Sequence, residues 1–258
     1  MEEAVSAGDL LAPNYAFVLE SARRMAGGGR VLDYGCRRGN VVAEGLKSGL
    51  DVFGAEVFYG GGHGDRERAA ELGLLQDRIF EIKNGCTPFA DGFFSLVVHN
   101  QVFEHVPDLR GTLREIRRIL APGGAMLSIF PSREVVREGH CGVPLAHRFA
   151  RSPRLRYAWL LSARMCGLGT FHGDKTPRRW ARDFSQWLSD WCYYRPESEI
   201  RDTYLREGFS YEGYEVEYAA FRLGYTGRGW AIPMVNFMPS VTRWLIRRLA
   251  GMVIVSRK

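Results

Sequence analysis

The feature that most constrains this sequence is the alternation, in its first half, of short β-rich runs with helical patterns. Such alternation is typical of βαβ units, which build a mostly parallel sheet. The pattern predicts strands at 30–34, 51–56, 78–82, 94–99 and 125–130. Helices fit between them at about 39–48, 65–74 and 109–120, and a helix capped by Asn14 precedes the first strand. An α/β fold is therefore expected.

The pattern changes after Pro131. Residues 132–206 show no clear strand and are rich in Arg, Trp and Tyr, whereas strand-like alternation returns at 209–218 and 252–257. We expect one domain over residues 1–258, a seven-stranded mostly parallel sheet with helices on both faces and a helical lid inserted before the last two strands. Open α/β sheets bind ligands at the carboxyl ends of their strands, and a lid at this point would cover that edge.

Composition narrows the class of protein. The 258 residues are 46% hydrophobic and 25% charged, which is ordinary for a globular protein and excludes wholesale disorder. No uncharged apolar run approaches the roughly 20 residues of a membrane span, and the acidic N-terminus does not match a secretory signal. Five cysteines without a C-x-x-C pair indicate neither a disulfide framework nor a zinc site. We expect a soluble cytoplasmic protein with no metal.

The net charge of +6 is unevenly distributed. Eleven basic residues stand against three acidic ones between Arg133 and Arg182, and six basic residues with no acid follow from Arg228 onward. A field of one sign attracts anions, so an anionic small molecule or saccharide is an expected partner. The stretch 241–251 would form a basic amphipathic helix, which can lie on an anionic membrane surface or pack against the sheet.

The segment VLDYGCRRGN at 31–40 joins an apolar strand to a helix through a turn that contains Gly35 and Gly39. Glycine lets the backbone approach a ligand closely, and a helix N-terminus offers unpaired N–H donors. Glu56 ends the second strand, 23 residues after Asp33, where a carboxylate can accept both hydroxyls of a ribose. Alone, the turn also fits Rossmann dehydrogenases, so it indicates only a nucleotide-like cofactor.

Two further segments complete an ordered set of motifs, NGCTPFADGFFSLVVHNQVFEHV at 84–106 and LREIRRILAPGG at 113–124. Together with the glycine turn they resemble the class I S-adenosylmethionine-dependent methyltransferases, in the small-molecule group that includes the ubiquinone-biosynthesis enzymes. The resemblance covers residues 30–131 well and implies a Rossmann-like fold with S-adenosylmethionine as cofactor. One departure is Arg37, which stands where the family usually has glycine and could either crowd the cofactor or point to solvent.

The resemblance also implies a set of cofactor-binding residues at the ends of the first four strands. These are Asp33, Gly35, Cys36 and Gly39 at the methionine half, Glu56 at the ribose, Asn84 and Gly85 at the adenine, and Asn100, Gln101 and His105 near the sulfonium. Other roles stay open for some of them. Asp33 could only cap the next helix, Glu56 could be a surface acid, and His105 could be a packing histidine.

The sequence says less about the acceptor, the molecule that receives the methyl group, than about the cofactor. A sugar or phenol hydroxyl usually needs a general base, and histidine suits neutral pH. His140 and His147 follow the fifth strand in EGHCGVPLAHRF. With GGHGDRERAA and HNQVFEHV, this stretch resembles a bacterial subgroup often associated with surface-polysaccharide gene clusters. That resemblance implies O-methylation of a sugar hydroxyl with either histidine as the catalytic base, although packing roles are the alternative for both.

Three alternatives remain at this point. The same fold could methylate a quinone or another lipid ring. The basic, aromatic-rich composition would suit a nucleic-acid methyltransferase, but HNQVFEHV follows the fourth strand in place of the N-P-P-Y type used on adenine, so no nucleic-acid partner is expected. Arg37 in the glycine turn leaves open a non-catalytic cofactor-binding protein. The sequence does not indicate the oligomeric state.

Overall fold

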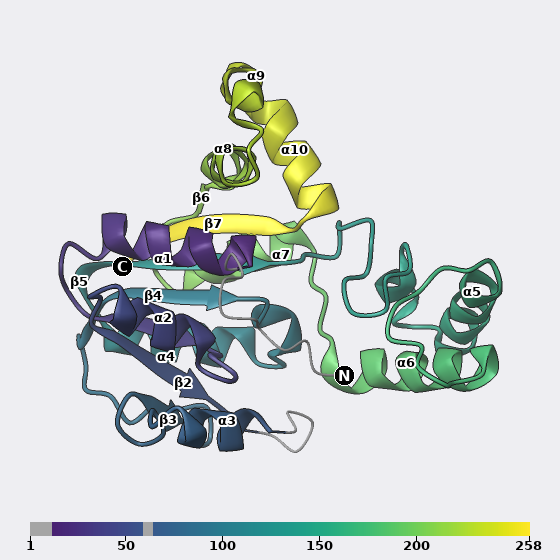
Figure 1. Cartoon of the computed structure of the whole chain (residues 1–258), viewed down its shortest axis with the longest axis horizontal. Coiled ribbons are helices and arrows are strands. Elements are labelled where there is room, and N and C mark those ends of the chain that lie inside the picture. Colours follow the sequence, from purple (N-terminus) through teal and green to yellow (C-terminus); the bar gives the residue numbers. More distant parts are fainter. Residues whose placement is uncertain (1–11, 59–63) are drawn as a thin grey trace.

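The computed structural model describes residues 12–58 and 64–258 (Figure 1). Its centre is a seven-stranded sheet in the order β3-β2-β1-β4-β5-β7-β6. The strands are β1 (Val31–Tyr34), β2 (Val52–Glu56), β3 (Ile79–Glu81), β4 (Phe94–Asn100), β5 (Leu120–Phe130), β6 (Glu212–Gly213) and β7 (Met252–Arg257). The first five are parallel, whereas β7 runs antiparallel to β5 and to β6. The predicted fold class is confirmed.

The strand order creates a crevice between β1 and β4. From β1 the chain moves outward to β2 and β3 on one side, and it returns to β4 on the other side. Crossovers on opposite faces leave an opening at the carboxyl ends of two such neighbouring strands, where open α/β sheets bind ligands. The β1–β2 register sets Asp33 beside Gly54, and the β2–β3 register sets Glu56 beside Glu81.

Helices cover both faces of the sheet, because successive side chains of a buried strand point to opposite sides. Buried residues of α1 (Pro13–Met25), α2 (Asn40–Lys47), α3 (Asp65–Glu71) and α8 (Glu215–Tyr225) join one apolar cluster with Val31 of β1. Those of α4 (Leu109–Ile119) and α7 (Glu197–Arg206) join a second cluster with Leu32. The predicted strands and helices of the first half are thus confirmed to within a few residues.

Two local predictions are wrong. The strand expected at 209–218 is reduced to β6, and α8 begins at Glu215. The reason is a change of period, because Tyr214, Tyr218 and Phe221 recur at helical spacing and all contact the ring of Phe17 on α1. The first helix begins at Pro13 without a side-chain cap. Asn14 lies in its first turn and instead bonds to Asn100 and Tyr218.

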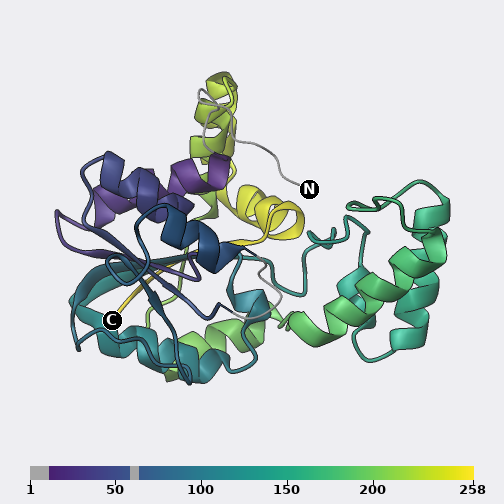
Figure 2. The same ribbon diagram turned by 60° about the horizontal axis from the view of Figure 1, so that its bottom comes forward.

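The segment between β5 and α7 carries a helical pair of its own. A short 3-10 helix, η2 (Ala146–Phe149), precedes α5 (Pro153–Met165) and α6 (Pro177–Trp191). Leu160, Trp180 and Leu188 of this pair are buried together in a third apolar cluster, separate from the two on the sheet. Figures 1 and 2 show α5 and α6 standing to one side of the sheet, beyond the end to which β4 points. α7 instead packs on the sheet, because Ile200 and Tyr204 join the second cluster.

A second projection follows α8. The 3-10 helix η3 (Gly229–Ala231), α9 (Ile232–Phe237) and α10 (Pro239–Leu249) form an arm that rises above the sheet in Figure 1 and leads into β7. Within the described ranges, no helix combines the length and the apolar character that crossing a bilayer requires.

Candidate cofactor pocket and histidine cluster

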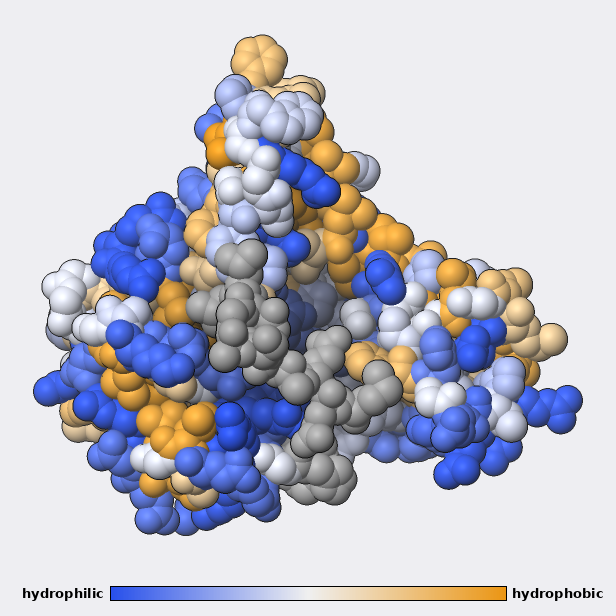
Figure 3. Space-filling model, in the orientation of Figure 1, coloured by the Kyte–Doolittle hydropathy of each residue, from blue (hydrophilic) through white to orange (hydrophobic). Residues whose placement is uncertain are grey.

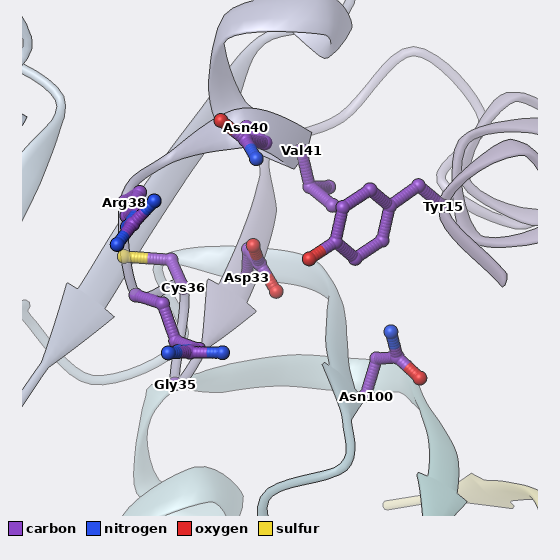
Figure 4. Close-up of a pocket in the computed structure, with 9 residues that line it drawn as sticks. Tyr15, Asp33, Gly35, Cys36, Arg38, Asn40, Val41 and Asn100 are labelled. Carbon is purple, nitrogen blue, oxygen red and sulfur yellow. The ribbon is translucent and has the colours of Figure 1, made fainter. Parts of the chain in front are cut away.

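A cavity of about 180 Å³ opens at the carboxyl end of β1, at the crevice beside β4 (Figure 4). It is lined by Tyr15, Asp33, Gly35, Cys36, Arg37, Arg38, Asn40, Val41 and Asn100. Four of the sequence-predicted cofactor residues therefore meet here, namely Asp33, Gly35, Cys36 and Asn100. Tyr15 was not among them, since nothing in an amphipathic helix pattern says which of its residues reaches a cavity.

Asp33 is the buried acid of this cavity, with only 5% of its surface exposed. Burial and the nearby carboxylate of Glu56 raise the pKa of Asp33 to about 7. Figure 4 shows the Tyr15 hydroxyl pointing toward the Asp33 carboxyl group from the facing helix. A carboxyl group that ionises near neutral pH in a confined pocket favours a cationic ligand, because a positive charge stabilises the ionised form.

Glycine is required at two positions of the turn after β1. Gly35 and Gly39 both have φ near +80°, in the left-handed region that side chains disfavour. A Cβ atom on Gly35 would lie 2.5 Å from Val102, and one on Gly39 would lie 2.4 Å from Ile79. The absence of a side chain at both positions therefore lets the turn pack closely against Val102 and Ile79. Gly39 contributes to this packing but is not among the residues that line the cavity.

Glu56 fixes the turn in place. Its carboxylate accepts the backbone N–H groups of Arg37 and Val57, both at 2.8 Å. Burial raises the pKa of Glu56, while these two hydrogen bonds act in the opposite direction. Each carboxylate oxygen has a second lone pair, so the group can still accept a hydroxyl. Glu56 therefore ties the end of β2 to the turn and keeps capacity to accept a further hydrogen bond.

Arg37 does not block the cavity. Its φ is 48°, so it takes the left-handed backbone conformation that a glycine would take at this position. Its side chain is 70% exposed and lies 3.4 Å from Asp65, which Arg38 also contacts at 2.9 Å. Both arginines thus line the cavity while pairing with an acid at the start of α3.

Three further cofactor candidates lie in two other places. Asn84 and Gly85 form an exposed two-residue turn after β3, with positive φ at both and backbone hydrogen bonds between Lys83 and Cys86. Gln101 is exposed at the end of β4 and donates its backbone N–H to Ile129. None of these three residues is part of the described cavity wall.

A histidine cluster lies beyond β4. The short 3-10 helix η1 (Phe103–His105) follows that strand, and the His105 ring is 4.9 Å from the His140 ring, centroid to centroid. His105 Nδ1 donates to the carbonyl of Trp191 at 2.7 Å, and Trp187 lies 4.7 Å from the His140 ring. The segment after β4, the segment after β5 and α6 therefore meet at these two histidines.

His140 is oriented by a buried carboxylate. Its Nδ1 lies 2.6 Å from Oε1 of Glu138, which also accepts the hydroxyl of Tyr194 at 2.7 Å and, on Oε2, the N–H of Cys141 at 2.6 Å. Burial alone would raise the pKa of Glu138, but these hydrogen bonds lower it to about 2. The ionised carboxylate can only accept, so Nδ1 of His140 carries a proton, and in the neutral form of the ring Nε2 is then the acceptor.

His147, the other predicted base, is placed differently. It is 3% exposed, its Nε2 lies 3.1 Å from the carbonyl of Arg133, and its ring lies 4.5 Å from that of Tyr194. Burial lowers its pKa. His147 therefore packs within the segment between β5 and α7, whereas the side chain of His140 is 27% exposed.

One group of described residues could hold a cation. Glu104 is 1% exposed, and neither of its carboxyl oxygens has a hydrogen-bond partner. A carboxyl oxygen of Glu104 and one ring nitrogen each of His105 and His140 all lie within 4.8 Å of one another. Burial raises the pKa of Glu104 to about 8, so this carboxyl group is mostly protonated at neutral pH. The sequence pattern did not reveal the group, because His140 lies 35 residues after its neighbours.

The parallel sheet, the glycine turn at its crevice and the buried acid on β1 are those of a class I methyltransferase. The chain belongs to the methyltransferase-domain family, whose model matches residues 8–216. The resemblance drawn from the motifs is thereby confirmed, and the class it names uses S-adenosylmethionine as cofactor.

Individual relatives share part of the chain. Methyltransferase GfsG of Streptomyces halstedii is 33% identical over 105 residues, covering 40% of this chain and 37% of the relative. A ubiquinone biosynthesis O-methyltransferase of Pectobacterium atrosepticum is 30% identical over 98 residues, covering 38% and 40%. The matches thus span about two fifths of these relatives. A solved S-adenosylmethionine-dependent methyltransferase from Mesorhizobium loti superposes with a TM-score of 0.56 at 16% identity, covering 96% of this chain and 99% of that one.

Proposed function

We propose that this protein transfers the methyl group of S-adenosylmethionine to a hydroxyl group of a small molecule, and that the acceptor is a sugar hydroxyl in surface-polysaccharide biosynthesis. The observation that carries the proposal is the Glu138–His140 pair, whose imidazole lies 4.9 Å from that of His105, five residues after the cavity residue Asn100. An amine or carbanion acceptor needs little beyond alignment with the donor, whereas a hydroxyl acceptor usually needs a general base.

The cofactor would lie in the described cavity with its methionine end toward Asp33. The cofactor supplies an electrophilic methyl group, and the residues of the chain hold and orient it. Asp33 attracts the positive charge, and Asn100 closes the side toward β4. The remaining assignments stay part of the proposal: Gly35, Cys36 and Gly39 would form the turn, Glu56 would bind the ribose, Asn84 and Gly85 would flank the adenine, and Gln101 and His105 would lie near the sulfonium.

His140 is the residue proposed to accept the hydroxyl proton. Its Nε2 takes the proton as the acceptor oxygen attacks, while the Nδ1–H bond to Glu138 holds the ring in place. The ionised Glu138 then stabilises the imidazolium that results. His147 suits this role less, because it is only 3% exposed and its Nε2 is bound to a backbone carbonyl.

A phenolic hydroxyl of a quinone precursor would be served by the same base, so quinone or other lipid-ring methylation is the second candidate. A labelled-methyl assay against fractionated cell extract, followed by mass spectrometry of the product, tests both. A labelled saccharide supports the first acceptor class and a labelled lipid the second. Label only in an amine-containing product would contradict the hydroxyl proposal.

Cofactor affinity should depend on pH through Asp33. Its pKa is raised to about 7, so it is mostly protonated at pH 6 and mostly ionised at pH 8. S-adenosylmethionine and its demethylated product both carry an ammonium group, which the ionised carboxylate attracts. We expect binding about tenfold weaker at pH 6 than at pH 8, measured by calorimetric titration with S-adenosylhomocysteine. Asp33→Asn should flatten the profile, and an unchanged slope in that variant would assign the dependence to another group.

A further inference from the structure

The arm formed by η3, α9 and α10 exposes an unusual amount of apolar surface. Six of its apolar side chains, two tryptophans and a phenylalanine among them, are between 45% and 85% exposed: Trp230, Met234, Phe237, Val241, Trp244 and Leu249. We call these six residues the arm face. Figure 3 shows hydrophobic colouring at the top of the molecule and down the flank below it, where Figure 1 places α9 and α10. A contiguous exposed patch of this kind marks an interaction surface.

The fold does not need the arm face for its own packing. α10 packs through Thr242, Ile246 and Ala250, of which Thr242 is 8% exposed and the other two pack against the first apolar cluster. Val241 and Trp244 lie on the opposite side of the helix, Leu249 is exposed at its C-terminal end, and α9 buries none of its residues. α10 therefore packs inward through one stripe and leaves a second, more apolar stripe outside.

Positive charge accompanies the arm face. From Arg228 to the C-terminus the chain has no acidic residue. Arg228 and Arg243 are exposed and form no ion pair within the described residues, and Arg248 lies 5.7 Å from the ring centroid of Trp244. Arg247 differs, because it is bound to Glu197 and Glu215 on neighbouring helices. The exposed arginines thus give the arm a positive electrostatic potential that attracts anions.

The end of α10 is hydrogen-bonded to the segment that follows β5. The N–H of Val136 donates to the carbonyl of Arg248 at 2.8 Å, and that of Leu145 donates to the carbonyl of Val136 at 2.8 Å. Val136 and Leu145 are 41% and 36% exposed. These two residues flank Glu138 and His140 in the sequence, so the end of α10 is joined directly to the segment that carries the proposed base.

We propose that the arm face docks on the surface of an anionic lipid bilayer. Exposed Trp and Phe side chains partition into the interfacial region, and unpaired arginines add attraction to anionic headgroups. Helices of six and eleven residues lie in this interface and do not cross it. Docking depends on the arm alone and not on which acceptor is methylated.

Sedimentation of the purified full chain with vesicles tests the proposal. We expect binding to phosphatidylcholine vesicles that contain about a third phosphatidylglycerol, weakening as salt rises because exposed charges are screened. The combined variant Trp230→Ser, Phe237→Ser and Trp244→Ser should abolish it. Leu205→Ser is the matched control, since Leu205 is 53% exposed on α7, and it should bind as the native chain does. Arg228→Gln with Arg243→Gln should lower binding about tenfold or more.

Three outcomes would overturn the proposal. These are no vesicle binding by the native chain, equal binding to neutral and anionic vesicles, and a concentration-dependent dimer in sedimentation velocity that the triple variant abolishes. The last would make a second copy of this chain the occupant. Calorimetric binding of S-adenosylhomocysteine by each variant checks that it is folded, and it reports on the methyltransferase proposal separately.

Discussion

Replacing His140 by alanine should lower turnover on a hydroxyl acceptor by about 10²–10⁴-fold and leave cofactor affinity unchanged. The loss follows from the geometry, because Glu138 holds the Nδ1 side of the ring and leaves Nε2 for the acceptor proton. Glu138→Gln should reduce turnover and shift the pH profile, since an amide no longer stabilises the imidazolium. The measurements are initial rates on the acceptor identified by labelling and calorimetric titration of the cofactor.

His147→Ala is the informative comparison. Sequence reasoning gave His140 and His147 equal standing, and the structure favours His140, because His147 is buried with Nε2 at a backbone carbonyl. Turnover at the native level in both variants would remove histidine general-base catalysis from the proposal. Assays with a chelator belong to the same series, and we expect no effect. A loss that a divalent cation restores would make His140 a metal ligand together with Glu104 and His105.

The second large effect concerns the cofactor pocket. Asp33→Ala and Glu56→Ala should each weaken cofactor binding by at least tenfold, about 1.4 kcal/mol, because polar groups would be left unpaired. For Glu56 the loss has two sources, since its carboxylate also holds the backbone N–H of Arg37. Thermal unfolding of that variant separates a loosened turn from a missing ribose contact.

Glu81→Gln is a matched control for this series. Glu81 ends the neighbouring strand directly beside Glu56, and its carboxylate contacts Arg66 at 3.4 Å near the surface. Cofactor affinity in Glu81→Gln should equal that of the native chain. Titration curves that are unchanged in both Asp33→Ala and Glu56→Ala would contradict the assigned site.

Much of the sheet could be predicted because local patterns determine it. Buried parallel strands are short apolar runs, and glycines such as Gly35 and Gly39 mark the turns between them. The prediction was wrong at 209–218, where tyrosines at both strand and helix spacing occur and contact with Phe17 selects the helix. A single sequence does not show which tertiary contact will decide between two periods.

In the candidate site, too, some residues could be predicted from local sequence patterns and others depend on tertiary contacts. Asp33 and Glu56 sit at strand ends, so the order of the strands places them together without further information. The group of Glu138, His140 and Tyr194 could not be predicted in this way. Tyr194 follows α5 and α6 in the sequence, and only the tertiary fold brings its hydroxyl to Glu138. Tyr15 reaches the cavity from a helix that the sequence marked only as amphipathic.

The way the segment between β5 and α7 is joined to the sheet has an evolutionary consequence. Glu138 and His140 lie near its N-terminal end, Tyr194 lies near its C-terminal end, and the helical pair between them has its own buried cluster. The proposed cofactor cavity is lined by residues of other segments, at the ends of β1 and β4 and on α1 and α2. If the proposed roles hold, exchange of this one segment between relatives transfers acceptor choice and proton acceptor as a unit. New specificities can then arise by recombination while the methyl-donor machinery is inherited intact.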